Sequence, residues 1–217
     1  MKIKAAVVFE TSGDFSIEQL EISEPRDDEV LVRIAAVGIC HTDLAGRDGH
    51  LPIPPPPSVF GHEGAGVVER VGKRVTKVNP GDHVVLAWDY CGACAACKSG
   101  KVLYCLNFFQ HNFHGARPDG TTTLSKSDQP IHGSFFCQSS FSDFALANER
   151  NVVKVRDDIP LEILGPMGCG IMTGAGGVMN TLQPRPGASI AVFGIGNLGM
   201  SAILSAVVCG CTTIIAV

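Results

Sequence analysis

The sequence predicts a mixed α/β chain, with a β-rich first part over residues 1–160 and the start of a doubly wound parallel sheet over 161–217. Two observations support this. Short apolar or alternating runs bounded by Gly, Pro or Asp fill the first half. From Pro186 to Val217 there is no Asp, Glu, Lys or Arg, as in parallel strands covered on both faces. With 45% hydrophobic and 18% charged residues, the composition fits a soluble globular protein and excludes disordered and collagen-like chains.

Five strands are expected in the first part, each read from alternation or from a short apolar run. They are Lys4–Phe9, Phe15–Leu20, Glu29–Val37, Gly64–Val71 and Asp82–Leu86. The proline-rich stretch Leu51–Ser58 is expected to be a loop, because proline lacks the N–H that a strand or helix needs.

The second part begins with a stretch, Pro160–Leu182, that predicts a helix interrupted early by Pro166 and several glycines. A buried strand, a helix and a second buried strand follow at Ser189–Phe193, Asn197–Val208 and Thr212–Val217. The charge-free stretch is long enough for a membrane anchor, but its glycines and polar residues favour the strand–helix–strand interpretation.

Charge and cysteine usage narrow the class of protein. Seventeen basic residues are scattered among 21 acidic ones, so no basic surface for nucleic acid is expected. The N-terminus has no signal-peptide pattern. Nine cysteines without an export signal indicate a reducing, cytoplasmic location, where metal binding or catalysis is commoner than disulfides.

Four cysteines predict a structural zinc site in a lobe covering about residues 88–108. They have the spacing C-x2-C-x2-C-x7-C and are Cys91, Cys94, Cys97 and Cys105. Two intervening residues let neighbouring thiolates face one tetrahedral ion, and four thiolates leave no position for water. An iron–sulfur cluster is the alternative, although the ferredoxin pattern has a gap of three residues and then a proline, whereas Leu106 follows here.

Three separated residues, Cys40, His62 and Cys169, suggest a second metal centre. Each one alone has a plain structural explanation, but together they make a Cys2His set that leaves a fourth position for water or substrate, which is typical of catalytic zinc. Asp43 and Glu63 are expected to support the ligands, by accepting the ring N–H of His62, or else to be surface carboxylates. Thr42 offers a hydroxyl that could take a proton from an alcohol, or is an ordinary turn residue.

A glycine loop follows the first strand of the second part. It reads Gly194-Ile195-Gly196-Asn197-Leu198-Gly199 and opens the predicted helix, the setting in which a GxGxxG loop binds a pyrophosphate. The alternative is a structural turn. An acidic residue that would bind the ribose is due about 20 positions after the loop, where the chain reaches Val217.

Taken in order, these elements resemble the zinc-dependent medium-chain alcohol dehydrogenases along the whole chain. Within that family the sequence motifs are most similar to those of aryl-alcohol (benzyl-alcohol) dehydrogenases. The motifs that carry the resemblance are GICHTDL, VFGHEGAGVVERVG, GDHVVL, SFFCQSSFSDFAL and GPMGCGIMTGAG.

The resemblance implies a GroES-like catalytic domain joined to a Rossmann domain, with two zinc ions per chain and NAD as cofactor. Its expected catalytic zinc ligands are Cys40, His62 and Cys169. Thr42 would start the proton relay, and the relay's second histidine is replaced by Ala45.

The resemblance also assigns cofactor contacts. His41 would contact the cofactor phosphate, and Thr173 would contact the nicotinamide. The loop from Gly194 to Gly199, which includes Gly196, Asn197 and Leu198, would hold the pyrophosphate. Trp88 and Phe141 are candidate walls of an aromatic substrate pocket, or core residues.

The sequence therefore predicts a dehydrogenase that oxidises a primary, aromatic alcohol to its aldehyde and transfers the hydride to NAD. One alternative is a related zinc dehydrogenase acting on a polyol or on a glutathione adduct of formaldehyde. Another is a catalytically silent zinc-binding fragment, since a full doubly wound domain has about six strands and 161–217 supplies only its beginning. Such a fragment would expose strand edges and aggregate, while the full-length parent is expected to be a homo-oligomer without nucleic-acid or membrane partners.

Overall fold

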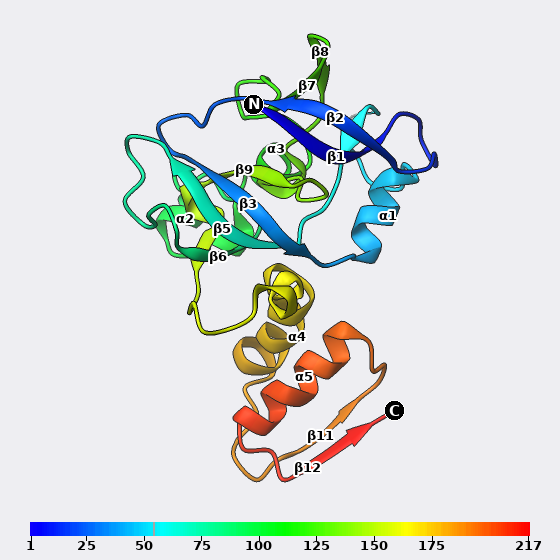
Figure 1. The fold of residues 1–217 in the computed structure, drawn as a ribbon. Helices are drawn as coiled ribbons and strands as arrows, with labels where there is room; N and C mark the ends of the chain where they lie inside the picture. The colour runs from blue at the N-terminus through cyan, green and yellow to red at the C-terminus, as the bar shows by residue number, and fades with distance from the viewer. Residues whose placement is uncertain (54) are drawn as a thin grey trace. The chain divides into compact units, whose positions relative to one another are not determined.

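The computed structural model describes residues 1–53 and 55–217 (Figure 1). The predicted loop Leu51–Ser58 contains Pro54, which lies outside the described residues. The chain forms two compact units, Met1–Gly165 and Pro166–Val217. The division falls five residues after the predicted boundary, because Leu161 and Leu164 are buried in the first unit.

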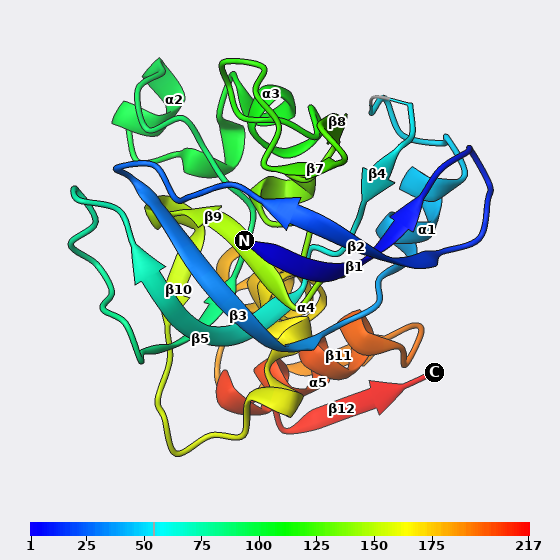
Figure 2. The ribbon, with the colours of Figure 1, turned by 45° about the horizontal axis from the view of Figure 1, so that its top comes forward.

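Two antiparallel sheets of five strands build the first unit. The strands β1 and β2 of one sheet cross the direction of β3 and β5 of the other (Figure 2). One sheet has the order β4-β1-β2-β7-β8, with bounds Ser58–Val59, Lys2–Val8, Ser16–Ile22, Leu124–Lys126 and Gln129–Ile131. The other has the order β10-β6-β5-β3-β9, with bounds Val152–Lys154, His83–Leu86, Gly64–Val71, Glu29–Val37 and Phe144–Asn148.

Strand β3 contributes to two of the hydrophobic core clusters of this unit. Leu31 is buried among side chains of β1 and β2, whereas Val30 and Val32 are buried among those of β5, β6 and β9. Successive side chains of a strand point to opposite faces, so a run of apolar residues lets one strand line two cores. This explains why Val30, Leu31 and Val32 are all buried in β3, whereas buried and exposed residues alternate at the start of β1.

Helices in the first unit are short and connect the strands. The α-helices are α1 (His41–Arg47), α2 (Ala95–Lys98) and α3 (Phe108–Asn112). The 3-10 turns are η1 (Val102–Tyr104), η2 (Phe135–Cys137), η3 (Glu149–Asn151) and η4 (Leu161–Ile163). Over the described residues, no helix is long and apolar enough to cross a membrane.

The second unit contains the predicted strand–helix–strand element. Strand β11 (Ser189–Val192) pairs in parallel with β12 (Thr213–Ala216), and α5 (Asn197–Val208) connects them. The helix predicted over Pro160–Leu182 is interrupted early, as expected: the 3-10 turn η5 (Gly165–Gly168) precedes the regular helix α4 (Gly170–Gly176), which continues as the π-helical η6 (Gly177–Leu182). Pro166 supplies no N–H for a longer helix.

The bounds of the predicted strands and of the helix Asn197–Val208 are confirmed to within two residues at each end. The expected burial of β11 and β12 is wrong for the described residues, because every residue of these two strands is exposed or only partly buried. Strands β4 and β7 to β10 and helices α1 to α3 were not predicted. Each of these elements has two to seven residues, too few for a periodic pattern to show.

A buried ion pair joins the start of β3 to the loop that follows α3. Arg117 donates from Nε and Nη2 to Glu29 Oε1 and Oε2 at 2.6 and 2.9 Å, and each residue is 8% exposed. The same guanidinium donates to Ser23 Oγ and to the Thr122 carbonyl, and Glu29 also accepts from the Arg26 amide. Both charges are therefore paired and hydrogen-bonded.

Removing only Arg117 should destabilise the protein strongly. We expect Arg117→Ala to lower the free energy of unfolding by about 3–5 kcal/mol, because the Glu29 carboxylate would stay buried without a partner. Chemical denaturation measures the change. The double variant Glu29→Gln/Arg117→Met should recover most of the loss. Arg74→Ala, which removes an exposed pair with Asp27 at 3.9 Å, is the control, with an expected change below about 0.5 kcal/mol. An equal decrease in the free energy of unfolding for Arg117→Ala and Arg74→Ala would contradict the prediction.

Candidate functional site

The four predicted cysteines come together at the surface lobe that contains α2 and η1. Their sulfur atoms all lie within 4.8 Å of one another, and Cys91 Sγ is 3.9 Å from Cys97 Sγ. Zinc–sulfur bonds of about 2.3 Å in a tetrahedron give sulfur–sulfur distances of about 3.8 Å. The cluster thus has the size needed for one tetrahedral ion.

Backbone N–H groups prepare one of these sulfurs for a cation. The amides of Ala93 and Cys94 donate to Cys91 Sγ at 3.4 and 3.3 Å, and these bonds lower the pKa of Cys91 to about 5. Burial raises the pKa of Cys97 to about 12. Because four neighbouring thiolates repel one another, a divalent ion is needed to hold all of them deprotonated.

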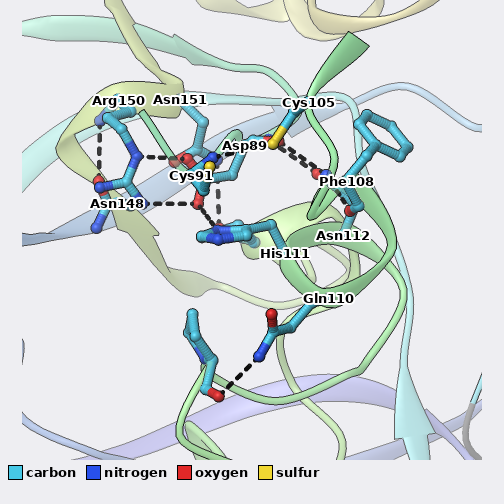
Figure 3. Close-up of polar contacts among 12 residues, drawn as sticks. Asp89, Cys91, Cys105, Phe108, Gln110, His111, Asn112, Asn148, Arg150 and Asn151 are labelled. Atoms are coloured by element: carbon cyan, nitrogen blue, oxygen red, sulfur yellow. Dashed lines mark hydrogen bonds and ion pairs between the residues drawn. The ribbon is translucent and has the colours of Figure 1, made fainter. Parts of the chain in front are cut away.

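The base of the lobe is closed by a buried carboxylate, Asp89, as Figure 3 shows. Its Oδ2 lies 2.7 Å from His111 Nδ1, and Arg150 donates to both carboxylate oxygens at 3.1 and 3.0 Å. The side chain of Asn112 bonds both the amide and the carbonyl of Asp89, at 2.8 Å each. The residues before and after the four cysteines are thereby joined to each other and to the body of the unit.

A second group of polar residues surrounds His62, whose ring is 1% exposed. The fully buried carboxylate of Asp43 accepts from His62 Nδ1 at 2.9 Å, and from the amides of Gly61 and Cys40 at 3.0 and 3.1 Å. With Nδ1 bound to the carboxylate, a metal ion would meet Nε2. The arrangement of carboxylate, imidazole and metal is common in zinc proteins.

Cys40 lies at the start of α1, beside this histidine. Its sulfur, a ring nitrogen of His62 and a carboxylate oxygen of Glu63 are within 4.8 Å of one another. A hydrogen bond with the His62 side chain lowers the pKa of Cys40 to about 7. Cys40 Sγ is also 3.5 Å from Thr42 Oγ1. Within the first unit, the structure therefore brings together the predicted residues of the second centre.

Glu63 is buried in a position that requires glycine at 38. A Cβ added to Gly38 would lie 2.0 Å from Glu63 Oε2, so no larger residue fits without a shift. Glu63 is 2% exposed, and it does not lie on the surface as the alternative interpretation supposed. The carboxylate that meets His62 Nδ1 is that of Asp43.

Residues 135–140, part of a motif that carries the family resemblance, pack around His62, although none of them was predicted as a site residue. Phe136 stacks on the imidazole with centroids 4.6 Å apart, and Phe135 meets it edge-on at 5.7 Å. Phe136, Cys137 and Ser139 have φ values of 50°, 54° and 47°, a region that costs about 1–3 kcal/mol for each residue other than glycine. The surrounding contacts must hold this conformation. Its signals in the sequence are the resemblance motif SFFCQSSFSDFAL and, within it, the polar run at 138–140 after two phenylalanines.

The two aromatic residues considered for a substrate pocket have different surroundings: Trp88 packs among other aromatic rings, and Phe141 lines an apolar cavity together with Ile39 and Leu44. Trp88 contacts Tyr90 and Phe108, with centroids 6.0 and 5.9 Å apart. Phe141 meets Phe15 at 5.8 Å and packs against the core beside β1. Among the aromatic contacts of the described residues, those to the His62 ring come from 135 and 136.

The remaining predicted residues lie at the surface or in the second unit. His41 is exposed at the start of α1. Cys169 immediately precedes α4 and is partly buried, and the exposed Thr173 follows one turn later, its amide donating to the Cys169 carbonyl at 2.8 Å.

The three glycines of the glycine loop differ in backbone conformation and in the space around them. Gly194 has a φ of +90°, and a Cβ on Gly199 would lie 1.8 Å from the Gly194 carbonyl oxygen. Nothing lies within 4 Å of a Cβ placed on Gly196, and Asn197 and Leu198 are exposed. The loop is thus tightly turned and closely packed at its ends, with its middle open to a ligand.

Comparison with known proteins places these features in a family. Residues 26–157 match the model of the alcohol dehydrogenase GroES-like domain. The chain is 49% identical to a geraniol dehydrogenase of Castellaniella defragrans over 99% of its length and 57% of that relative. It is 40% identical to an S-(hydroxymethyl)glutathione dehydrogenase of Escherichia coli over 95% of its length and 56% of that relative.

Two solved structures are similar over the whole chain. One is an alcohol dehydrogenase zinc-binding domain protein from Burkholderia ambifaria, with 53% identity and a TM-score of 0.96. The other is the benzyl alcohol dehydrogenase of Acinetobacter calcoaceticus, with 48% identity and a TM-score of 0.93. The chain covers 58% of each of these structures. The chain belongs to the zinc-dependent medium-chain alcohol dehydrogenase family, and its first unit has that family's GroES-like fold.

Proposed function

We propose that this protein oxidises a primary aromatic alcohol to its aldehyde, with transfer of a hydride to NAD. The observation that carries the proposal is the group Asp43, His62 and Cys40, in which a buried carboxylate fixes the ring of a buried histidine beside a partly buried thiol of lowered pKa. A histidine and a cysteine arranged in this way suit zinc.

The residues described fit the proposed metals. Cys91, Cys94, Cys97 and Cys105 would hold a structural zinc, and Cys40 and His62 would hold the catalytic one. Cys169, in the second unit, is the proposed third ligand. Zinc bound there would act as a Lewis acid that lowers the pKa of the alcohol, and NAD would accept the hydride.

The protein's own groups have separate tasks in this reaction. Asp43 keeps the proton of His62 on Nδ1 and fixes the direction of the ring. Thr42 Oγ1, 3.5 Å from Cys40 Sγ, would accept the proton that the alcohol loses. Phe135 and Phe136 cover the imidazole and exclude water from it.

The open middle of the glycine loop supports the NAD proposal. Gly194, Gly196 and Gly199 would let the backbone approach a pyrophosphate at the start of α5, where helix N–H groups favour an anion. Thr173 and His41 are the proposed contacts to the nicotinamide and the phosphate.

The substrate class rests on the similar proteins. The likeness to benzyl alcohol dehydrogenase favours an aromatic alcohol, whereas the 40% identity to S-(hydroxymethyl)glutathione dehydrogenase supports the second candidate. Reduction of NAD with benzyl alcohol, geraniol, a polyol and S-hydroxymethylglutathione tests the choice. The highest kcat/KM should be with benzyl alcohol, and a preference for the glutathione adduct would support the second candidate instead. Zinc-loaded protein that reduces no NAD with any of them would indicate the catalytically silent alternative.

Replacing Cys40 should separate the two metal sites. We expect Cys40→Ser to lower the zinc content from two ions per chain to one and to abolish alcohol-dependent NAD reduction, because the serine hydroxyl is a poor ligand for zinc. Elemental analysis and steady-state kinetics measure both effects. Cys209→Ser, at a partly buried free cysteine after α5, is the matched control and should leave both values unchanged. Turnover at the normal rate in Cys40→Ser would disprove the assignment.

The Asp43 carboxylate, which binds His62 Nδ1, should affect zinc affinity without touching the substrate. We expect Asp43→Asn to weaken zinc binding at this centre by about 10–100-fold, because an amide holds the imidazole N–H less strongly than a carboxylate. Competition with a chromophoric chelator measures the affinity, and the four-cysteine site of the same chain is the internal control. Asp143→Asn, at an exposed carboxylate that accepts from the Lys4 amide, is the control variant. Unchanged affinity at both sites would contradict the role of Asp43.

A further inference from the structure

We propose that Gln138 is a positioning residue that holds the His62 loop in the conformation in which the imidazole meets both Asp43 and Cys40. The inference rests on the proposed function, since it assigns a role toward the catalytic metal. Gln138 follows η2, and its side chain touches neither Cys40 nor the ring of His62 among the contacts found for the described residues.

The side-chain amide of Gln138 is buried and bonds to three backbone groups. Nε2 donates to the carbonyl of His62 at 3.0 Å and to that of Ala87 at 3.2 Å. Oε1 accepts from the amide of Gly64 at 3.1 Å. The residue is 1% exposed, so water does not replace these bonds. A primary amide has both donors and an acceptor, and a carboxylate of the same size would lose the two donated bonds.

These bonds hold parts of the loop that Asp43 does not bind. Asp43 binds the amide of Gly61 and the ring of His62, and Gln138 binds the carbonyl of His62 and the amide of Gly64, where β5 begins. A backbone movement that carries His62 away from Asp43 would break at least one of these bonds. The position of the His62 backbone, from which the imidazole reaches Asp43, therefore depends on bonds at both ends of a four-residue loop.

Close packing leaves this loop no alternative position nearby. A Cβ on Gly64 would lie 2.8 Å from Ser140 Cβ and 3.0 Å from Gln138 Oε1, and one on Gly61 would lie 2.4 Å from the Phe141 amide. The Ser140 amide donates to the Gly61 carbonyl at 2.9 Å. The loop and the segment 135–140 thus fit together as one surface, and Gln138 supplies the bonds to the residues on either side of Glu63.

The left-handed residues around Gln138 agree with this role. Cys137 and Ser139, on either side of it, both have positive φ values, which place the Gln138 side chain between the loop and the end of β6. Strained backbone of this kind persists where surrounding contacts determine it, and such sites are often functional.

The test compares Gln138→Met with Gln19→Met in protein loaded with Co²⁺ at both metal sites. Methionine keeps the approximate volume of glutamine but makes none of the three bonds, and Gln19 is exposed on β2. The readouts are the visible absorption of Co²⁺ and its rate of release to a chelator. We expect Gln138→Met to shift the absorption of one ion and to release it about tenfold faster, near the lower limit for groups that orient metal ligands. The ion at the four cysteines and both ions of Gln19→Met should behave as in the wild type.

Three other outcomes would contradict the role of Gln138 or the proposed function. Release of both ions from Gln138→Met at wild-type rates, with an unchanged spectrum, overturns the positioning role even if the variant is less stable. Equal acceleration at both sites also overturns it, because the effect would then be general destabilisation. A wild-type protein that binds only one Co²⁺ overturns the proposed function itself, and the role of Gln138 with it. Should Gln138→Met fail to fold, Gln138→Asn, which keeps the amide but is one methylene shorter, carries the same expectation.

Discussion

The carboxylate of Asp43 is the contact on which the arrangement of the candidate catalytic centre depends. It joins the start of α1 to the loop before β5 by accepting from the amides of Cys40 and Gly61 and from the ring of His62. Its full burial is offset by these three donors, since an ionised group away from water needs partners of this kind. One side chain therefore sets both the distance between two ligands and the tautomer of the histidine. The lowered pKa of Cys40 is a consequence, because it arises mainly from the neighbouring His62 side chain.

The segment 135–140 completes the surroundings of the histidine from the opposite side. Phe136 stacks on the ring, Gln138 bonds the backbone of the loop, and Ser139 donates to the Val59 carbonyl while accepting from the Phe135 amide. These contacts offset the unfavourable φ values of three of its residues. Segments distant in sequence thus determine the geometry of the ligand, and the backbone is strained where the polar contacts are densest. The same principle holds at the four-cysteine lobe, where Asp89, His111 and Arg150 join its base to the body of the unit.

Much of the candidate site could be predicted from the sequence because metal ligands and glycine loops have fixed chemistry and short spacings. The four cysteines at 91–105 lie close enough for one ion, as their spacing indicated. Gly194 and Gly199 have the turn and the close approach that a GxGxxG pattern requires. Gln138 and Phe136 could not be found in this way, because neither residue belongs to a spacing pattern and their contacts with the His62 loop and with Ala87 span 51 to 76 positions. For the same reason Trp88 and Phe141 were candidates by nearness in sequence alone; Trp88 packs against other aromatic rings, and Phe141 also lines a cavity.

The sequence by itself determined the longer strands, the helix Asn197–Val208 and the candidate metal ligands, because periodicity and ligand chemistry act over a few neighbouring residues. Only the tertiary structure decided which carboxylate meets His62. Asp43 and Glu63 were equal candidates in the sequence, and the fold places Asp43 on Nδ1 and Glu63 over Gly38. It also decided that β3 lines two cores and that Arg117 neutralises Glu29 across 88 positions. The partners of these side chains depend on burial, because burial determines the free energy of placing a charged or aromatic side chain away from water. Burial is a property of the folded chain as a whole.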